Sequence, residues 1–127
     1  MPRILVVDDD PDVVEACRLV LETEGYEVSE ANNRPDGMAR VAEVKPDLII
    51  LDVMMDQPDD GIVMAQELRR EGNVTPVLML TSVNKVIGLE LGADSEVLPV
   101  AAFCEKPIEP AQLLENVATL LKEGGAL

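Results

Sequence analysis

The segment Leu48-Ile49-Ile50-Leu51-Asp52 places four aliphatic residues in a row and ends them at one carboxylate. Short aliphatic runs bounded by charge, Gly or Pro are typical of strands buried on both faces of a sheet. Three further runs end at or near polar residues that can contact phosphate: residues 4–7 before Asp8 and Asp9, residues 77–80 before Thr81, and residues 101–104 before Lys106. Ligands of open α/β sheets bind outside the carboxyl ends of the strands, so we expect these side chains to meet at one edge.

Helical patterns separate the predicted strands. Asp10-Pro11 supplies a cap residue followed by Pro at the first helical position. The pattern predicts strands near 3–8, 26–31, 48–52, 75–81 and 101–105, and helices near 11–24, 36–44, 62–71, 84–92 and 110–123. Five strands in alternation with about five helices imply right-handed crossovers onto a parallel sheet that is covered on both faces. We therefore expect one α/β domain over residues 1–127.

Composition excludes several classes of protein. The 127 residues hold 25 acidic and 10 basic side chains, and the net charge of −15 repels nucleic acid and anionic membranes. No apolar stretch approaches the roughly 20 residues that span a bilayer, and the chain enters a strand without a signal peptide, so we expect a cytoplasmic protein. Cys17 and Cys104 lack CxxC spacing and fall on predicted buried elements, which indicates free packed thiols. The chain has no His, and a zinc site is not expected.

Four ordered motifs carry a family resemblance that spans essentially the whole chain. They are Val6-Val7-Asp8-Asp9-Asp10, Leu51-Asp52-Val53-Met54-Met55 with Gly61 beyond it, Leu80-Thr81-Ser82, and Phe103-Cys104-Glu105-Lys106-Pro107. Together they resemble the signature of the response-regulator receiver domain of two-component signal transduction. The resemblance implies a flavodoxin-like, doubly wound, five-stranded parallel sheet of order 2-1-3-4-5 with helices on both faces.

The resemblance also implies roles for individual residues. Asp52 would be the phosphoacceptor, and Mg²⁺ would be held by Asp9, Asp52 and the backbone carbonyl of Met54, with Asp8 assisting through a metal-bound water. Two further side chains, Thr81 and Lys106, would contact the phosphoryl oxygens. Phe103 would be the aromatic residue whose side chain reports the phosphorylation state.

The chemistry of these side chains agrees with the implied roles. Mg²⁺ prefers oxygen ligands and usually takes one or two carboxylates together with waters and a phosphate. A carboxylate such as Asp52 can attack phosphorus when a metal and a fixed cation neutralise the equatorial oxygens of an in-line transfer. Lys106 would be that cation, and Thr81 a neutral donor. Crowding Asp8, Asp9 and Asp52 in one cleft should also raise carboxylate pKa values and destabilise the metal-free fold near neutral pH.

The resemblance implies a signalling switch that accepts a phosphoryl group from the phosphohistidine of a sensor histidine kinase or a phosphotransfer protein. Output would pass through protein–protein interaction to a downstream protein that the sequence does not identify, with no direct contact to nucleic acid or membrane. The chain would not be an enzyme apart from transferring phosphate to itself and slowly releasing it. The sequence leaves open the cognate kinase, the oligomeric state, and whether the chain stands alone or belongs to a longer regulator.

Two other functions remain alternatives. A degenerate receiver would dock to partners independently of phosphorylation. An aspartyl-phosphate hydrolase similar to haloacid dehalogenases would use the Asp-x-Asp within residues 8–10, but Asp12 stands where those enzymes usually have Thr or Val, and the chain leaves little room for their cap domain.

Single residues also have simpler interpretations. Residues 8–10 could only cap a helix, Thr81 could only be a cap residue, and Phe103 could belong to the core. The chain departs from the family pattern at Asp56, where Pro is common, and at Gly61, which comes one residue late. The segment 84–100 is also atypical, because residues 95–100 make it longer than in a typical receiver.

Overall fold

The computed structural model describes residues 2–53, 55, 60–82, 102–106 and 108–125. Strands and helices alternate along these residues, in the order β1 (Arg3–Val7), α1 (Pro11–Glu22), β2 (Glu27–Ala31), α2 (Arg34–Val44), β3 (Leu48–Asp52), α3 (Asp60–Arg70), β4 (Val77–Ser82), β5 (Ala102–Lys106) and α4 (Pro110–Glu123). The helix predicted over 84–92 lies outside the described residues. Every other predicted element is present.

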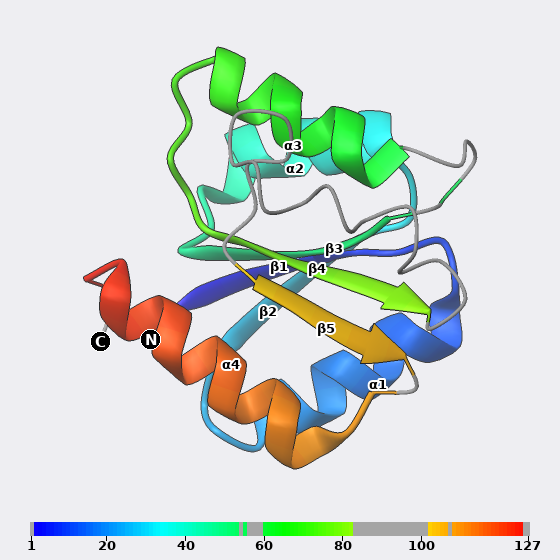
Figure 1. The fold of residues 1–127 in the computed structure, drawn as a ribbon, viewed down its shortest axis with the longest axis vertical. Helices are drawn as coiled ribbons and strands as arrows, with labels where there is room; N and C mark the ends of the chain where they lie inside the picture. The colour runs from blue at the N-terminus through cyan, green and yellow to red at the C-terminus, as the bar shows by residue number, and fades with distance from the viewer. Residues whose placement is uncertain (1, 54, 56–59, 83–101, 107, 126–127) are drawn as a thin grey trace.

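The five strands form one parallel sheet in the order β2-β1-β3-β4-β5 (Figure 1). This order confirms the predicted doubly wound arrangement. β3 lies at the centre, and all five of its residues are buried. Its aliphatic run is continuous because both faces of the strand are covered by helices.

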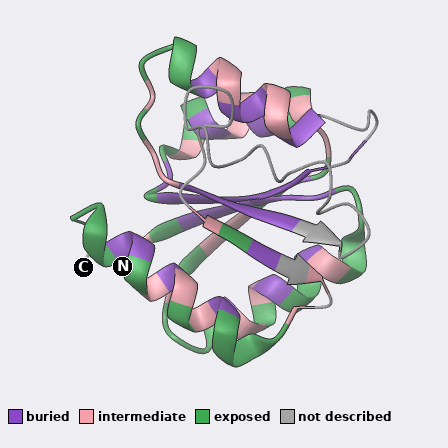
Figure 2. Cartoon of the chain, in the orientation of Figure 1, coloured by how far each residue is buried: buried purple, intermediate pink, exposed green. Residues whose placement is uncertain are grey.

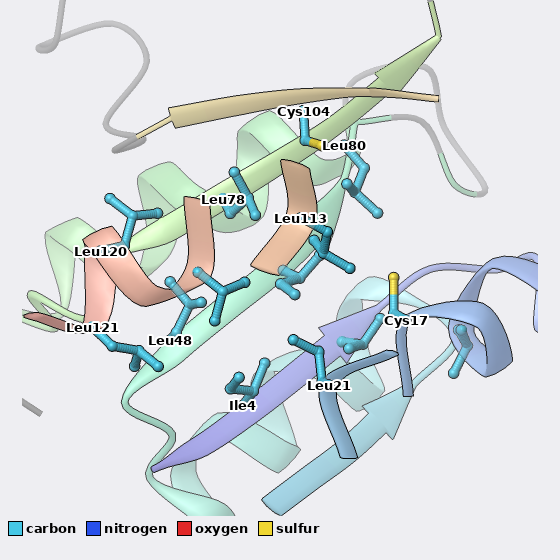
Figure 3. Packing of buried hydrophobic residues seen from close by; sticks show 14 residues of the cluster. Ile4, Cys17, Leu21, Leu48, Leu78, Leu80, Cys104, Leu113, Leu120 and Leu121 are labelled. Atoms are coloured by element: carbon cyan, nitrogen blue, oxygen red, sulfur yellow. The ribbon is translucent and has the colours of Figure 1, made fainter. Parts of the chain in front are cut away.

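Two hydrophobic cores lie on opposite faces of the sheet. On one face, Ile4 and Val6 of β1 pack with α1 and α4, whereas Leu5 and Val7 point to the other face, which α2 and α3 cover (Figures 1 and 2). This alternation follows from the period of two residues in a strand. Neither Cys17 nor Cys104 is in a disulfide, and both thiols are buried in the α1–α4 core, as the sequence predicted (Figure 3).

Helix caps decide where the helices begin. α1 begins at Pro11 because the Asp10 side chain accepts a hydrogen bond from the backbone of Asp12. The prediction that α2 starts at residue 36 was wrong by two positions, because the Asn33 side chain caps the helix at Arg34. None of the helices that the structure describes combines the length and the apolar character needed to cross a bilayer.

Several other predicted limits were also off by one or two residues. α1 ends at Glu22 instead of residue 24, because the chain turns there and Gly25 adopts a φ of +82°. β4 begins at Val77 instead of residue 75. The preceding Pro76 has no backbone N–H, but its carbonyl accepts a hydrogen bond from Ile49 of β3.

Candidate functional site

The sheet topology brings three charged side chains to one edge. Asp8 directly follows β1, Asp52 is the last residue of β3, and Lys106 is the last residue of β5. In a parallel sheet all carboxyl ends lie at the same edge, and β1 and β3 are hydrogen-bonded neighbours. The predicted convergence of these strand ends is therefore present.

Three carboxylates form a compact cluster at this edge. Asp8, Asp9 and Asp52 each offer one oxygen, and these oxygens lie within 4.8 Å of one another. Asp8 is fully buried and Asp52 is 3% exposed, whereas Asp9 is exposed. Two of the carboxylates are thus held in a desolvated position beside a third that faces solvent.

Lys106 is the cation that faces this cluster. Its Nζ lies 3.0 Å from Oδ2 of Asp8 and donates a hydrogen bond of 3.1 Å to Oδ1 of Asp52. The other oxygen of Asp8, Oδ1, accepts a hydrogen bond from the backbone of Asp10, which fixes the orientation of the carboxylate. Asp8 Oδ2 is buried and has the Lys106 ion pair but no hydrogen bond of good geometry.

Burial and charge shift the proton affinities at the site. Burial raises the pKa of Asp52 to about 6, and the negative charges of Asp8 and Asp9 add to the shift, although Lys106 opposes it. Burial alone would lower the pKa of Lys106, but its contacts with Asp8 and Asp52 outweigh this cost and raise that pKa. The predicted rise in carboxylate pKa is confirmed for Asp52, where burial is a larger cause than the like charges.

The residues present fit a small divalent cation. All the ligands on offer are oxygens, which is the donor type that Mg²⁺ takes. Three carboxylates facing one ammonium leave an excess of negative charge, and Asp8 Oδ2 is a buried acceptor whose hydrogen-bonding capacity is not filled. A cation at this position would balance the excess negative charge and would give Asp8 Oδ2 a second positively charged partner beside Lys106.

The chain returns to the end of β3 at Gly61. The backbone N–H of Gly61 donates a 2.9 Å hydrogen bond to the carbonyl of Val53. A Cβ atom on Gly61 would lie 2.0 Å from the carbonyl oxygen of Asp52, which is an impossible contact. A glycine is required here because the first turn of α3 rests directly on the peptide group between Asp52 and Val53.

Sequence reasoning missed an ionic cluster beside the site. Arg34, at the start of α2, pairs with the buried Asp60 at the start of α3, and also with Glu67 about two turns further along α3. Asp60 lies just before the helix predicted over 62–71, whereas in the structure it is the first residue of α3. No local pattern predicts this contact, because its partners lie 26 and 33 positions apart in the chain.

The remaining predicted site residues are only partly described. Met54 lies outside the described residues, and for Thr81 the structure describes the backbone in β4 but not the side chain. Phe103 lies in β5 opposite Met79 and is 37% exposed. The simpler interpretation of Phe103 as a core residue was wrong, because β5 is an edge strand of the described sheet.

A groove gives access to the carboxylates from one side. It has a volume of about 710 Å³, lies between α1 and α2, and reaches Asp8 and Asp9. Leu19 of α1 lines this groove and is 60% exposed.

Comparison with known proteins agrees with the geometry. Residues 4–118 match the response regulator receiver domain family. The chain belongs to this family. A receiver domain is a module of two-component signalling whose function depends on phosphorylation, and members are generally not enzymes in their own right. Receiver domains interact with histidine kinases or phosphotransfer proteins.

Individual relatives show how far the similarity extends. The receiver is 37% identical to the DNA-binding dual master transcriptional regulator RpaA of Synechocystis sp., over 96% of this chain and 50% of that protein. It is also 37% identical to the alkaline phosphatase synthesis transcriptional regulatory protein PhoP of Bacillus subtilis, over 94% of this chain and 48% of that protein. The chain thus spans about half the length of these relatives.

A solved structure supports the same fold. The chemotaxis response regulator CheY4 of Vibrio cholerae superposes with a TM-score of 0.82 at 27% identity, covering 94% of this receiver and 98% of that chain. This neighbour is matched over nearly its full length.

Proposed function

We propose that Asp52 is the phosphoacceptor of this receiver and that Mg²⁺ is held by Asp9, Asp52 and the backbone carbonyl of Met54, with Asp8 assisting through a metal-bound water. The observation that carries the proposal is the meeting of Lys106 with two buried carboxylates beside the exposed Asp9. A buried cluster of like charges costs stability, and a fold retains such a cluster where the charges serve binding or chemistry.

The transfer follows from the chemistry of a carboxylate nucleophile. An oxygen of Asp52 attacks phosphorus and forms a P–O bond, while the bond from phosphorus to the donor breaks and its electron pair leaves with the donor. Lys106 is positioned to neutralise charge on the equatorial oxygens, and Thr81, from β4, would donate a hydrogen bond to one of them. Mg²⁺, when bound, supplies the remaining positive charge.

The donor in the cell is proposed to be a phosphohistidine of a sensor kinase or a phosphotransfer protein. Phosphorylated Asp52 carries added negative charge that would compete with Asp8 for the ammonium group of Lys106, which now contacts both carboxylates. Such a move, together with Thr81 and the exposed Phe103, would change the surface near β4 and β5. Slow loss of phosphate by attack of water would reset the domain.

Output is proposed to pass through protein contacts. The net charge of −15 opposes direct binding of this stretch to a phosphate backbone. Two relatives are named as a DNA-binding or a transcriptional regulator, and this chain covers about half of each. We infer that residues 1–127 do not themselves bind DNA.

Mass spectrometry of the intact protein tests the proposal. With acetyl phosphate and Mg²⁺, the wild type should gain the mass of one phosphoryl group, and chelation of Mg²⁺ should prevent the gain. Asp52→Asn should abolish it, whereas Asp12→Asn, which removes an exposed carboxylate from the first turn of α1, should not.

Two outcomes would contradict the proposal. Phosphate found on Asp8 or Asp10 would show that this residue, and not Asp52, is the phosphoacceptor. Failure of every phosphodonor to label the folded protein would favour a receiver that docks to partners without phosphorylation, and multiple turnovers of a phosphomonoester would indicate a hydrolase.

A further inference from the structure

The ion pair between Arg34 and Asp60 joins α2 to the first turn of α3. Arg34 Nε donates a 3.1 Å hydrogen bond to Oδ1 of Asp60, and the guanidinium also pairs with Glu67. The Asp60 side chain is 7% exposed, and the Arg34 side chain 34%. The planar guanidinium of Arg34 holds the Asp60 carboxylate in a defined orientation. Loss of Arg34 would remove a charged partner from this buried carboxylate.

Asp60 is covalently linked to the residue that contacts the phosphoacceptor strand. Its neighbour Gly61 donates a hydrogen bond to the carbonyl of Val53, and the Gly61 backbone lies against the carbonyl of Asp52. A shift of Asp60 therefore moves the backbone of Gly61, which contacts the carbonyl groups of both Asp52 and Val53. There is no side chain on Gly61 to absorb the movement.

Arg34, the other partner of the ion pair, also lies in a closely packed part of the fold. Asn33 caps α2 directly before Arg34. Gly37, one turn later, allows α2 to pack so closely that a Cβ atom there would lie 3.0 Å from Met64 of α3 and 3.1 Å from Val7 of β1. Arg34 thus projects from a helix that is packed against both α3 and the strand that precedes Asp8.

We propose that Arg34 is a positioning residue for phosphoryl transfer, which acts through Asp60 and Gly61 to hold the end of β3 and hence Asp52. This inference rests on the proposed role of Asp52. Arg34 is not itself expected to touch the phosphoryl group. Misplacement of a reacting group by about 1 Å can slow a reaction by up to about a hundredfold, so loss of the ion pair should be visible in the rate.

The test compares the variants Arg34→Gln and Arg40→Gln. Arg40 is on the same helix, is exposed to a similar extent and pairs with Glu43 on the surface, so its loss changes the net charge equally. At saturating Mg²⁺ and well below the melting temperature, Arg34→Gln should be phosphorylated by acetyl phosphate about tenfold more slowly than wild type. Arg40→Gln should stay within about twofold, and Arg34→Lys should recover part of the rate.

A double-mutant cycle identifies the route of the effect. If Arg34 acts through Asp60, the double variant Arg34→Gln/Asp60→Asn should be no slower than the slower single variant. Glu67→Gln removes the second partner of Arg34 and should have a smaller effect. Additive losses in the double variant would overturn the route through Asp60.

Two readouts separate this inference from the proposed function. In the metal-free protein, the amide resonances of Val53 and Gly61 should shift in Arg34→Gln but not in Arg40→Gln. If wild type is phosphorylated and both arginine variants react equally fast, the positioning role of Arg34 is rejected. If wild type takes no phosphate, the role of Asp52 is rejected, and the resonances alone decide whether Arg34 holds the end of β3.

Failure of the Arg34 variants to fold would also decide the question. Unfolding of both Arg34→Gln and Arg34→Lys at 10 °C would show that Arg34 serves stability, and would overturn the positioning role. A lower melting temperature with an unchanged rate for the folded protein would lead to the same conclusion.

Discussion

The ammonium group of Lys106 donates a 3.1 Å hydrogen bond to the carboxylate of Asp52, which lies 54 positions earlier in the chain. The two residues end β5 and β3, and β4 lies between these strands in the sheet. The long Lys side chain is able to reach across that strand. In this arrangement Lys106 balances the buried carboxylates, and it occupies the position from which it could later meet a phosphoryl group.

Replacement of Lys106 by Met should weaken the metal-free fold and strengthen metal binding. Without the cation, Asp8 and Asp52 remain buried with unpaired charge, which should cost between about 1 and 3 kcal/mol of unfolding free energy at pH 8. Removal of a nearby positive charge should also tighten Mg²⁺ binding by about tenfold. Urea unfolding and calorimetric titration measure the two effects, and Lys122→Met on α4 is the matched control.

The same Lys106 variant tests the coupling of phosphate to structure. Asp52 should still become phosphorylated, but more slowly, and the amide shifts that accompany phosphorylation should be smaller than in wild type. Equal shifts in Lys106→Met and wild type would show that another residue transmits the change.

Replacement of Asp9 by Asn should stabilise the metal-free protein. Asp9 adds like charge to the cluster, so its neutralisation should raise Tm by about 2 °C, as expected for about 0.5 kcal/mol in a domain of this size. In wild type, Mg²⁺ at ten times its Kd should add about 1.4 kcal/mol of stability, and Asp9→Asn should lose most of this gain. Thermal melts with Mg²⁺ and with EDTA provide the measurement.

Asp12→Asn is the control for this change, because Asp12 is exposed in the first turn of α1 and lies outside the carboxylate cluster. It should keep the full response to Mg²⁺. An unchanged Tm on addition of Mg²⁺ to wild type would mean that the three carboxylates do not share a metal.

Stability of the metal-free protein should depend on the ionisation of Asp52. Its folded pKa of about 6 lies above the ordinary value of 3.8, so the native state keeps a proton that the unfolded chain has lost. The resulting penalty is complete above pH 6 and disappears as the pH falls toward 4. It amounts to at most about 3 kcal/mol, since one pKa unit corresponds to about 1.4 kcal/mol.

The variant Asp52→Asn isolates this contribution. In EDTA, it should be more stable than wild type at pH 7.5, and the difference should shrink between pH 6 and 4. Chemical unfolding at several pH values measures the difference. A constant difference over this range would show that Asp52 titrates with an ordinary pKa.

The two cysteines should react only when the protein opens. Cys17 and Cys104 are buried, and burial together with the charge of Asp8 raises the pKa of Cys17 to about 12. Labelling with a thiol reagent at pH 7.5 should therefore be limited by unfolding. Mg²⁺ at ten times its Kd should slow it about tenfold. The single variants Cys17→Ala and Cys104→Ala report each thiol, and rapid labelling of either in the native protein would contradict the prediction.

The sequence was sufficient to predict most of the fold and the centre of the site. Continuous aliphatic runs predict buried strands, and parallel strands must end at one edge, so the convergence of Asp8, Asp52 and Lys106 follows from topology. The aliphatic runs are local sequence patterns, and the only long-range rule needed is that parallel strands end at the same edge of the sheet. Boundaries were less accurate, because a single cap residue such as Asn33 decides where a helix starts.

The contacts between helices could not be predicted in the same way. Arg34 meets Asp60 only because α2 and α3 cover the same face of the sheet, and nothing in either segment marks the pairing. The present contact of Lys106 with Asp8 was likewise not predicted, since its expected role concerned a phosphoryl group. Packing between distant segments sets these contacts.

A methyl group at Gly61 should disrupt the end of β3. In Gly61→Ala, the new Cβ would lie 2.0 Å from the carbonyl oxygen of Asp52 and 2.9 Å from Cα of Val53, so the backbone must move. Overpacking of this kind costs up to about 3 kcal/mol. The displaced Asp52 should also be phosphorylated more slowly, even at saturating Mg²⁺.

Gly72→Ala separates this effect from the general cost of losing a glycine. Gly72 has a φ of +83° and no atom within 4 Å of a new Cβ, so the change costs about 1 kcal/mol of backbone strain and creates no collision. Gly72→Ala should thus be mildly destabilised but phosphorylated at the wild-type rate. Equal rates in Gly61→Ala and Gly72→Ala would show that the contact of α3 with the end of β3 does not position Asp52. That result would also remove the structural basis for the role of Arg34.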